Sequence, residues 1–202
     1  MDAIITNALT NALHALFLLS YFILAFRQWQ KGNAKFTGFI VSFFLIVFLL
    51  KILGVLVHYL SGNDYVNDLW LAIAMGVVLH NYFLIHAMRI PETLRAITMV
   101  FSLFLAGCFI IHDNFIFIAL LLIMVYLLAA IYSEKLTRFG FISVITANII
   151  WIILREGSRF ILGYEVPIEW RFDNDVYHLL LIIATFIVYL SIQRGDWSYP
   201  KN

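Results

Sequence analysis

Apolar segments of about twenty residues recur from one end of the sequence to the other. The clearest of them reads FIVSFFLIVFLLKILGVLVHYL, and comparable segments precede and follow it. Hydrophobic residues make up 63% of the chain and charged residues only 12%, so a soluble domain of this size could not bury its apolar side chains. We therefore expect an integral membrane protein whose spans are α-helices.

Interruptions in the apolar pattern divide the chain into seven predicted spans, which we take as one transmembrane domain covering residues 1–202. The predicted spans are 5–26, 36–59, 67–88, 94–111, 115–133, 139–155 and 175–192. The narrowest interruption is His112-Asp113-Asn114, which we expect to form a tight hairpin at the surface. The longest is 156–174, which we expect to be a loop able to cap a cavity. The predicted fold class is an all-α seven-transmembrane helix bundle.

The distribution of lysine and arginine predicts the orientation of this bundle. Connections on one side carry Arg27, Lys31, Lys35, Arg89, Arg95, Lys135 and Arg138, and the C-terminal tail adds Arg194 and Lys201. Such residues favour the cytoplasmic side, which places the N-terminus outside and the C-terminus in the cytoplasm. The net charge is only +1 and no basic block occurs, so we expect no nucleic-acid partner.

With this topology, polar residues within the spans gather in the outer half of the bundle. Asn7, Asn11 and His14 are spaced i, i+4 and i+7, which puts them on one face of the first span. His58 ends the second span and His178 lies near the start of the seventh, so the two histidines should lie at one membrane depth. We therefore expect several helices to direct polar groups into a shared cavity.

Lys51 lies about two helical turns deeper than His58, roughly 10 Å, beyond comfortable reach of the outer interface. It must therefore meet a carboxylate, water or a lipid phosphate. Other polar residues of the cluster could have a purely structural role. His58 could end its helix at the headgroups, and Asn174 and Asp175 are good residues for a helix N-cap and first turn.

Two imidazoles with one or two carboxylates form a donor set that suits zinc. Zinc takes three or four nitrogen and oxygen ligands, and at a catalytic site it lowers the pKa of a bound water to about 7. His58 and His178 could supply the nitrogens, with Asp175 or Asp68 as the oxygen donor or as the group that holds the water. The sequence contains no G-x-S-x-G motif and no P-loop that would favour another chemistry.

These residues resemble the motifs of the CREST superfamily of seven-span membrane proteins, which includes alkaline ceramidases, progestin and adiponectin receptor-like proteins and haemolysin-III-type bacterial proteins. That family carries S-x-x-x-H late in its second span, an aspartate at the start of the third and H-x-x-x-H in the seventh. The corresponding segments here are Gly54-x-x-x-His58, Asp68 in VNDLWLAIAM, and Asn174-x-x-x-His178. A glycine thus replaces the serine, and an asparagine replaces one histidine. The resemblance implies zinc held by the histidines, and its bacterial branch implies a bacterial inner membrane.

Two functional hypotheses follow. The first is a membrane-embedded, zinc-dependent hydrolase that cleaves an amide or ester bond of a membrane lipid, and the surviving histidines favour it. The second is a non-catalytic lipid- or small-molecule-binding or sensing protein with a degenerate metal site, and Asn174 favours it. The candidate catalytic residues are Asp68, Lys51 and Arg155, and the candidate metal ligands are His58, His178, Asp175 and Asn174.

Overall fold

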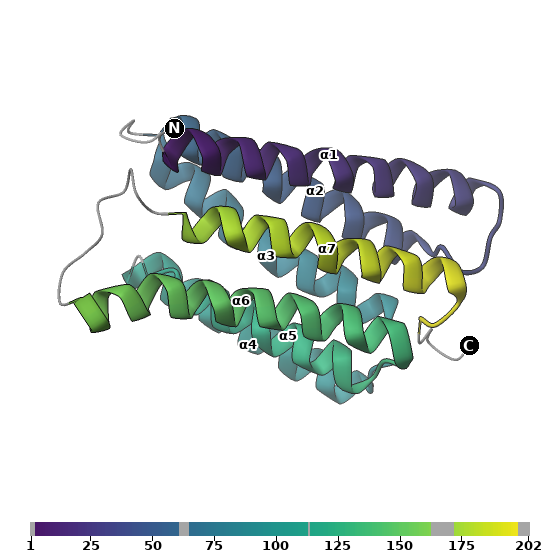
Figure 1. Cartoon of the computed structure of the whole chain (residues 1–202). Helices are drawn as coiled ribbons and strands as arrows, with labels where there is room; N and C mark the ends of the chain where they lie inside the picture. The colour runs from purple at the N-terminus through teal and green to yellow at the C-terminus, as the bar shows by residue number, and fades with distance from the viewer. Residues whose placement is uncertain (1–2, 61–64, 113, 163–171, 198–202) are drawn as a thin grey trace.

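The computed structural model describes residues 3–60, 65–112, 114–162 and 172–197, and all regular structure within these ranges is helical. The helices are α1 (Ala3–Gln30), α2 (Gly38–Tyr59), α3 (Val66–Ala87), α4 (Glu92–His112), α5 (Ile116–Ile131), α6 (Lys135–Leu162) and α7 (Asp173–Arg194) (Figure 1). The all-α class is confirmed, and each helix overlaps one predicted span, although α5 is shorter than the predicted 115–133. Among the described helices, all except α5 are long and apolar enough to cross a membrane, as an integral membrane protein requires.

The end of α6 differs from what the sequence pattern predicts. α6 continues to Leu162, so residues 156–162 are helical and do not belong to the predicted loop. Hydropathy marks where apolar composition ends, whereas a helix continues until a cap or a breaker stops it. The remainder of that loop up to residue 171, and Asp113 of the predicted hairpin, lie outside the described residues. α7 ends at Gly195, whose φ of 83° suits a glycine C-cap.

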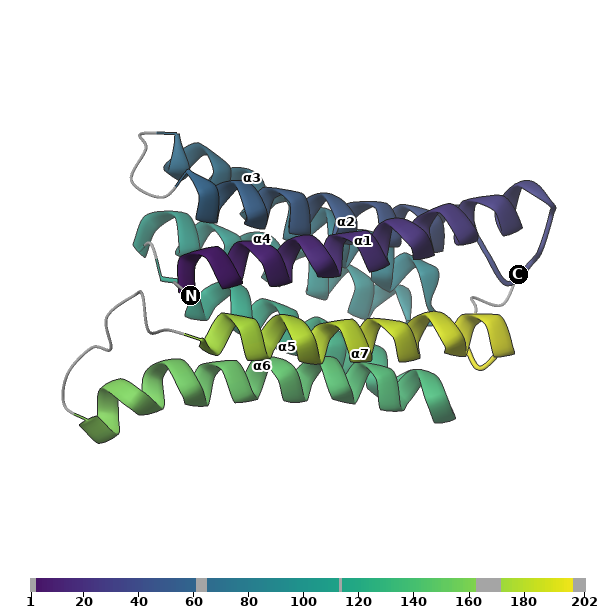
Figure 2. The ribbon, with the colours of Figure 1, turned by 45° about the horizontal axis from the view of Figure 1, so that its top comes forward.

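The helices form a closed ring. Each helix packs against its neighbours in sequence, and α7 returns to lie against α1 (Figures 1 and 2). α3 also contacts α5 directly, which leaves α4 on the outer side of the ring. The first turn of α1 and the last turn of α7 lie at opposite ends of the bundle (Figure 1). Large apolar side chains cover much of the outside, for example Leu16 on α1, Phe104 on α4 and Ile183 on α7, as expected of a surface that faces lipid.

Gly140 sets the separation of α6 and α7. A Cβ atom at this position would lie 2.8 Å from Val188 Cγ2 and 3.2 Å from the Val188 backbone nitrogen. Real Cβ atoms do not approach other atoms so closely, so any larger residue would push α7 away. Gly140 therefore fixes the position of α7, the helix that carries His178.

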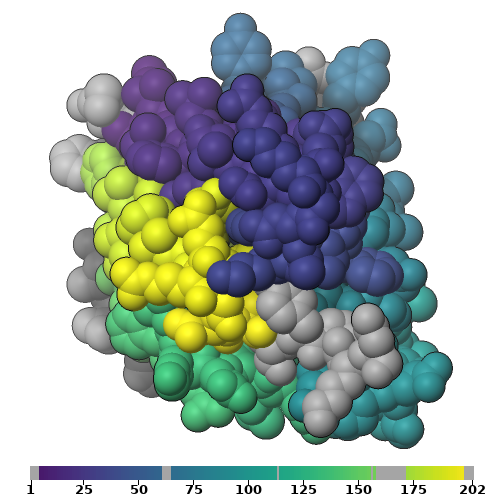
Figure 3. All heavy atoms as spheres, turned by 90° about the vertical axis from the view of Figure 1, so that its right-hand side faces the viewer, coloured from purple at the N-terminus to yellow at the C-terminus, as the bar shows by residue number. Residues whose placement is uncertain are grey.

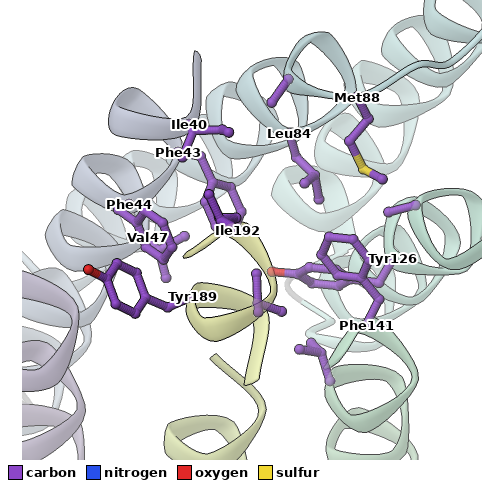
Figure 4. Packing of buried hydrophobic residues seen from close by; sticks show 14 of the residues in the cluster. Ile40, Phe43, Phe44, Val47, Leu84, Met88, Tyr126, Phe141, Tyr189 and Ile192 are labelled. Carbon is purple, nitrogen blue, oxygen red and sulfur yellow. The ribbon is translucent and has the colours of Figure 1, made fainter. Parts of the chain in front are cut away.

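An apolar core fills the half of the bundle that contains the C-terminal end of α7. Its aromatic centre includes Tyr189, which stacks on Tyr21 with ring centroids 4.8 Å apart and meets Phe44 edge-on (Figure 4). Ile192 and Phe141 belong to the same cluster. This tightly packed half anchors the helices against one another.

At the surface of this apolar half, hydrogen bonds connect the end of α7 to residues near the start of α2 and of α6. Lys35 Nζ donates to the Gln193 carbonyl, 3.1 Å away, and the Thr137 hydroxyl donates to the Asp196 carbonyl, 2.8 Å away. Figure 3 views this end and shows the C-terminal part of α7, in yellow, between the α1–α2 connection and the start of α6. The helices are thus tied together opposite the polar half.

Candidate functional site

The other half of the bundle encloses a cavity of about 420 Å³, within the range of small-molecule sites. α1, α2, α3, α5, α6 and α7 contribute to its wall, and the described residues of α4 do not. Apolar side chains such as Val47, Ile73 and Leu122 cover part of the wall. Its polar side chains include Asn7, Asn11, His14, Lys51, His58, His80, Asn148, Arg155, Tyr177 and His178. The cavity is therefore amphipathic.

Lys51 and His178 form a polar pair in the cavity wall. Lys51 Nζ lies 3.2 Å from His178 Nδ1 and 5.4 Å from the centroid of the Tyr177 ring. Because an ammonium group only donates, His178 accepts through Nδ1 and carries its proton on Nε2. Lys51 also interacts electrostatically with His14 and His58. The described partners of this lysine are thus imidazoles and an aromatic ring, and no carboxylate is among them.

The structure brings His58 and His178 into one cavity, as the predicted topology requires. Both line the wall, and they interact electrostatically. Asp68, expected at the same site, lies elsewhere. It is exposed on the first turn of α3 and is not one of the lining residues. Its position at the start of that span is as predicted, but its side chain is exposed and does not line the cavity.

Asp175 joins α7 to α1. Its Oδ2 accepts a hydrogen bond of 2.7 Å from the Thr6 hydroxyl, and its Oδ1 accepts one of 2.8 Å from the Thr10 hydroxyl. The carboxylate is buried and is not one of the cavity-lining groups. Sequence reasoning placed Asp175 in the polar cluster but missed Thr6 and Thr10, because both lie off the Asn7–Asn11–His14 stripe.

Asn174 and Arg155 both attach to Trp151, which the sequence analysis missed. The Trp151 indole nitrogen donates to Asn174 Oδ1 at 2.7 Å, and the Arg155 guanidinium lies 5.1 Å from the Trp151 ring centroid. The spacing could have identified this tryptophan, since Asn148, Trp151 and Arg155 share one helical face. Asn174 therefore supports the wall of the cavity at the α6–α7 contact.

His14 lies at the α1–α7 contact, fully buried. Its Nε2 is 3.3 Å from the Thr185 hydroxyl, which itself donates to the Leu181 carbonyl at 2.8 Å. The imidazole must then donate through Nε2, and its Nδ1 has no hydrogen-bond partner among the described groups. This places an acceptor nitrogen in the wall close to Lys51.

Two further polar contacts shape the wall. Gly54 faces Asn11, since a Cβ at Gly54 would lie 3.1 Å from Asn11 Oδ1. The absence of a side chain at Gly54 thus leaves room for the asparagine. At the base of the cavity, Tyr126 and His80 are joined by a hydrogen bond of 2.8 Å. His80 Nδ1 also bonds to Asn81 Oδ1 at 2.9 Å, so both ring nitrogens of this histidine have hydrogen-bond partners.

The predicted zinc ligands do not form one donor set in this arrangement. Among the residues that the structure describes, no three His, Cys, Asp or Glu side chains are grouped so that they could hold a metal ion. Both oxygens of Asp175 accept from threonines, and Asn174 Oδ1 accepts from an indole. His178 directs Nδ1 to Lys51, and a cation there would repel a divalent ion. In this arrangement the described side chains of the predicted ligands do not converge on one position for zinc.

Comparison with known proteins gives a family without an assigned function. No curated protein and no solved structure matches the chain. A family model described as a family of unknown function, DUF6962, matches residues 6–196. The match covers α1 from Thr6 onwards, all of the other six helices and every polar residue of the cavity named above. The chain therefore belongs to the DUF6962 family.

Proposed function

We propose that this protein binds a lipid or a small amphiphilic molecule in the cavity of its membrane bundle. The observation that carries the proposal is the amphipathic wall, to which Lys51 and His178 contribute polar groups and Val47, Ile73 and Leu122 contribute apolar side chains. A bundle that needed only stability would fill this space with apolar side chains, as the opposite half does. Polar groups retained at membrane depth indicate a ligand.

We further propose that all seven helices cross the membrane, with the N-terminus outside, in a bacterial inner membrane. Support comes from the lysines and arginines of the α1–α2, α3–α4 and α5–α6 connections. In a Cys108→Ser background, an impermeant maleimide added outside should label Gly62→Cys and leave Lys31→Cys unlabelled. The reverse pattern would show that the bundle is inserted the other way round.

Binding is tested with two soluble amphiphiles, laurate and dodecanol, added to protein in a neutral maltoside detergent. We expect at least one of them to raise the midpoint temperature of unfolding in a saturable manner, because a ligand that binds only the folded state stabilises it. Leu122→Trp places a larger side chain in the cavity wall and should abolish the shift. Leu120→Trp, on the lipid-facing side of the same helix, is the matched control and should retain it. If neither amphiphile stabilises the native protein, the proposal is wrong.

A zinc-dependent lipid hydrolase is the second candidate. It is favoured by His58 and His178, which the resemblance to the CREST superfamily implies as ligands and which line one cavity beside Lys51. The two functions differ in the fate of the bound molecule. A binding protein returns the amphiphile unchanged, whereas a hydrolase would release products from an ester or amide and contain about one zinc per chain when purified without chelator.

A further inference from the structure

We propose that the cavity selects ligands that carry one negatively charged group, a carboxylate or a phosphate, and that Lys51 binds this group. The inference rests on the proposed binding function and specifies the chemistry of the ligand. The charged side chains of the cavity wall support it. Lys51 and Arg155 line the cavity, and among the described lining residues the only carboxylate is Asp173, in the first turn of α7 at the end of the cavity.

The cation lies deep while the carboxylate lies at the edge. Lys51 is near the middle of the α2 sequence, whereas Asp173 is the first residue of α7. A lysine inside a membrane bundle is costly unless an anion or hydrogen-bond acceptors compensate it. His178 supplies one acceptor at 3.2 Å, but a neutral imidazole carries no compensating charge. The missing negative charge is one that a ligand can bring.

Asp175 does not neutralise the charge of Lys51. It is the buried carboxylate of α7, yet the Thr6 and Thr10 hydroxyls each occupy one of its oxygens. It interacts electrostatically with His58 but is not a contact of Lys51. If the protein only needed to neutralise its lysine, this carboxylate would be the natural partner. Its attachment to α1 leaves the ammonium group available to a ligand.

The surroundings of Lys51 fit an amphiphile better than a free ion. Tyr177 offers its ring face 5.4 Å from Nζ, and Leu50, Val47 and Leu181 give the wall an apolar surface nearby. An acidic group at Lys51 would therefore be attached to a hydrocarbon chain that lies on these side chains. Arg155 stacks on Trp151, so it is engaged elsewhere in the wall and is not the principal anchor.

The experiment measures dissociation constants for laurate, dodecyl phosphate, dodecanol and dodecylamine, with acetate and inorganic phosphate as anions that lack a chain. The protein is the full chain in neutral maltoside detergent. We expect laurate or dodecyl phosphate to bind at least about 10-fold more tightly than dodecanol, since a hydrogen bond to a charged group contributes about 1.5–3 kcal/mol. Acetate and inorganic phosphate should bind far more weakly than the matching amphiphile. Tight binding of free phosphate would overturn the assignment of an amphiphile.

Lys51→Met tests the anchor itself, because methionine keeps most of the length of the side chain and removes the charge. It should weaken binding of the anionic amphiphile about 10–100-fold and leave dodecanol within about 2-fold. Retained dodecanol binding shows that the cavity is still folded. Lys51→Arg should restore part of the preference, and Lys31→Met, at an exposed lysine beyond α1, should change nothing.

The outcomes separate the two proposals. If the native protein binds dodecanol and laurate equally and Lys51→Met alters neither, the charge assignment is wrong while the binding function stands. If no amphiphile binds, the binding function itself is wrong. A preference for dodecylamine would also overturn the assignment, since it would show that the wall acts as an anionic site.

Discussion

Gly140→Leu is expected to destabilise the protein by about 3 kcal/mol or more, the largest effect of any single substitution considered for this fold. Even a Cβ atom at this position meets the Val188 backbone nitrogen at 3.2 Å and Val188 Cγ2 at 2.8 Å. A backbone atom cannot move aside as a flexible side chain can, so α7 must shift as a whole. A loss of this size lowers the midpoint temperature of unfolding by roughly 6–12 °C, measured by heating in detergent followed by size-exclusion chromatography.

Gly107→Leu on α4 is the matched control. It makes the same chemical change in a helix of the same bundle, but nothing lies within 4 Å of the position its Cβ would take. Its unfolding temperature should therefore equal or exceed that of the native protein, because leucine favours a helix more than glycine does. Equal losses at Gly140 and Gly107 would show that glycine flexibility, and not the close contact of α6 and α7, explains the effect.

The helices could be predicted because the bilayer imposes one length and one composition on every span. Each of the seven helices overlaps a predicted apolar segment. The main error was the end of α6, which continues through Gly157 to Leu162. Hydropathy detects the edge of the hydrocarbon and not the last hydrogen bond of a helix, so a helix that extends beyond the membrane is read as a loop.

The site could be predicted in part, for a similar reason. Topology fixes membrane depth, and depth alone brings His14, His58 and His178 to the same end of the bundle. Topology does not fix the rotation of a helix about its axis. Asp68 is therefore exposed and does not line the cavity, and Asp175 meets α1 through threonines that showed no pattern of their own.

Lys51 illustrates what sequence reasoning could and could not supply. Its depth in α2 indicated that it must have a partner, and the structure gives that partner as His178. The sequence pattern predicts a carboxylate, water or a lipid phosphate as this partner, and the imidazole of His178 is none of these. Only the packing of α1 against α7 shows that Asp175 is engaged by hydroxyls, and this contact depends on which faces of the two helices meet.

Asp175→Ala is expected to destabilise the protein by about 3 kcal/mol, the second largest effect. Each of its two hydrogen bonds, from Thr6 and Thr10, joins a hydroxyl to a buried carboxylate, and bonds to charged groups contribute about 1.5–3 kcal/mol each. The estimate lies at the lower end because Thr10 can instead bond to the Thr6 carbonyl, already 3.0 Å away. The loss is measured as the decrease in the midpoint temperature of unfolding.

A double-mutant cycle separates this attachment from the effect of a negative charge at a helix start. Thr10→Val combined with Asp175→Ala should cost less than the sum of the two single changes, because both remove the same bond. Asp173→Ala removes an acidic residue from the same first turn of α7 and should cost at most about 1 kcal/mol, the usual size of a helix-dipole interaction. If Asp173→Ala and Asp175→Ala cost the same and the cycle shows no coupling, the dipole explains the stability and the α1–α7 attachment contributes nothing. If the coupling appears, Asp175 stabilises the protein through its hydrogen bonds to the α1 threonines. The same hydrogen bonds then hold the Asp175 carboxylate away from Lys51.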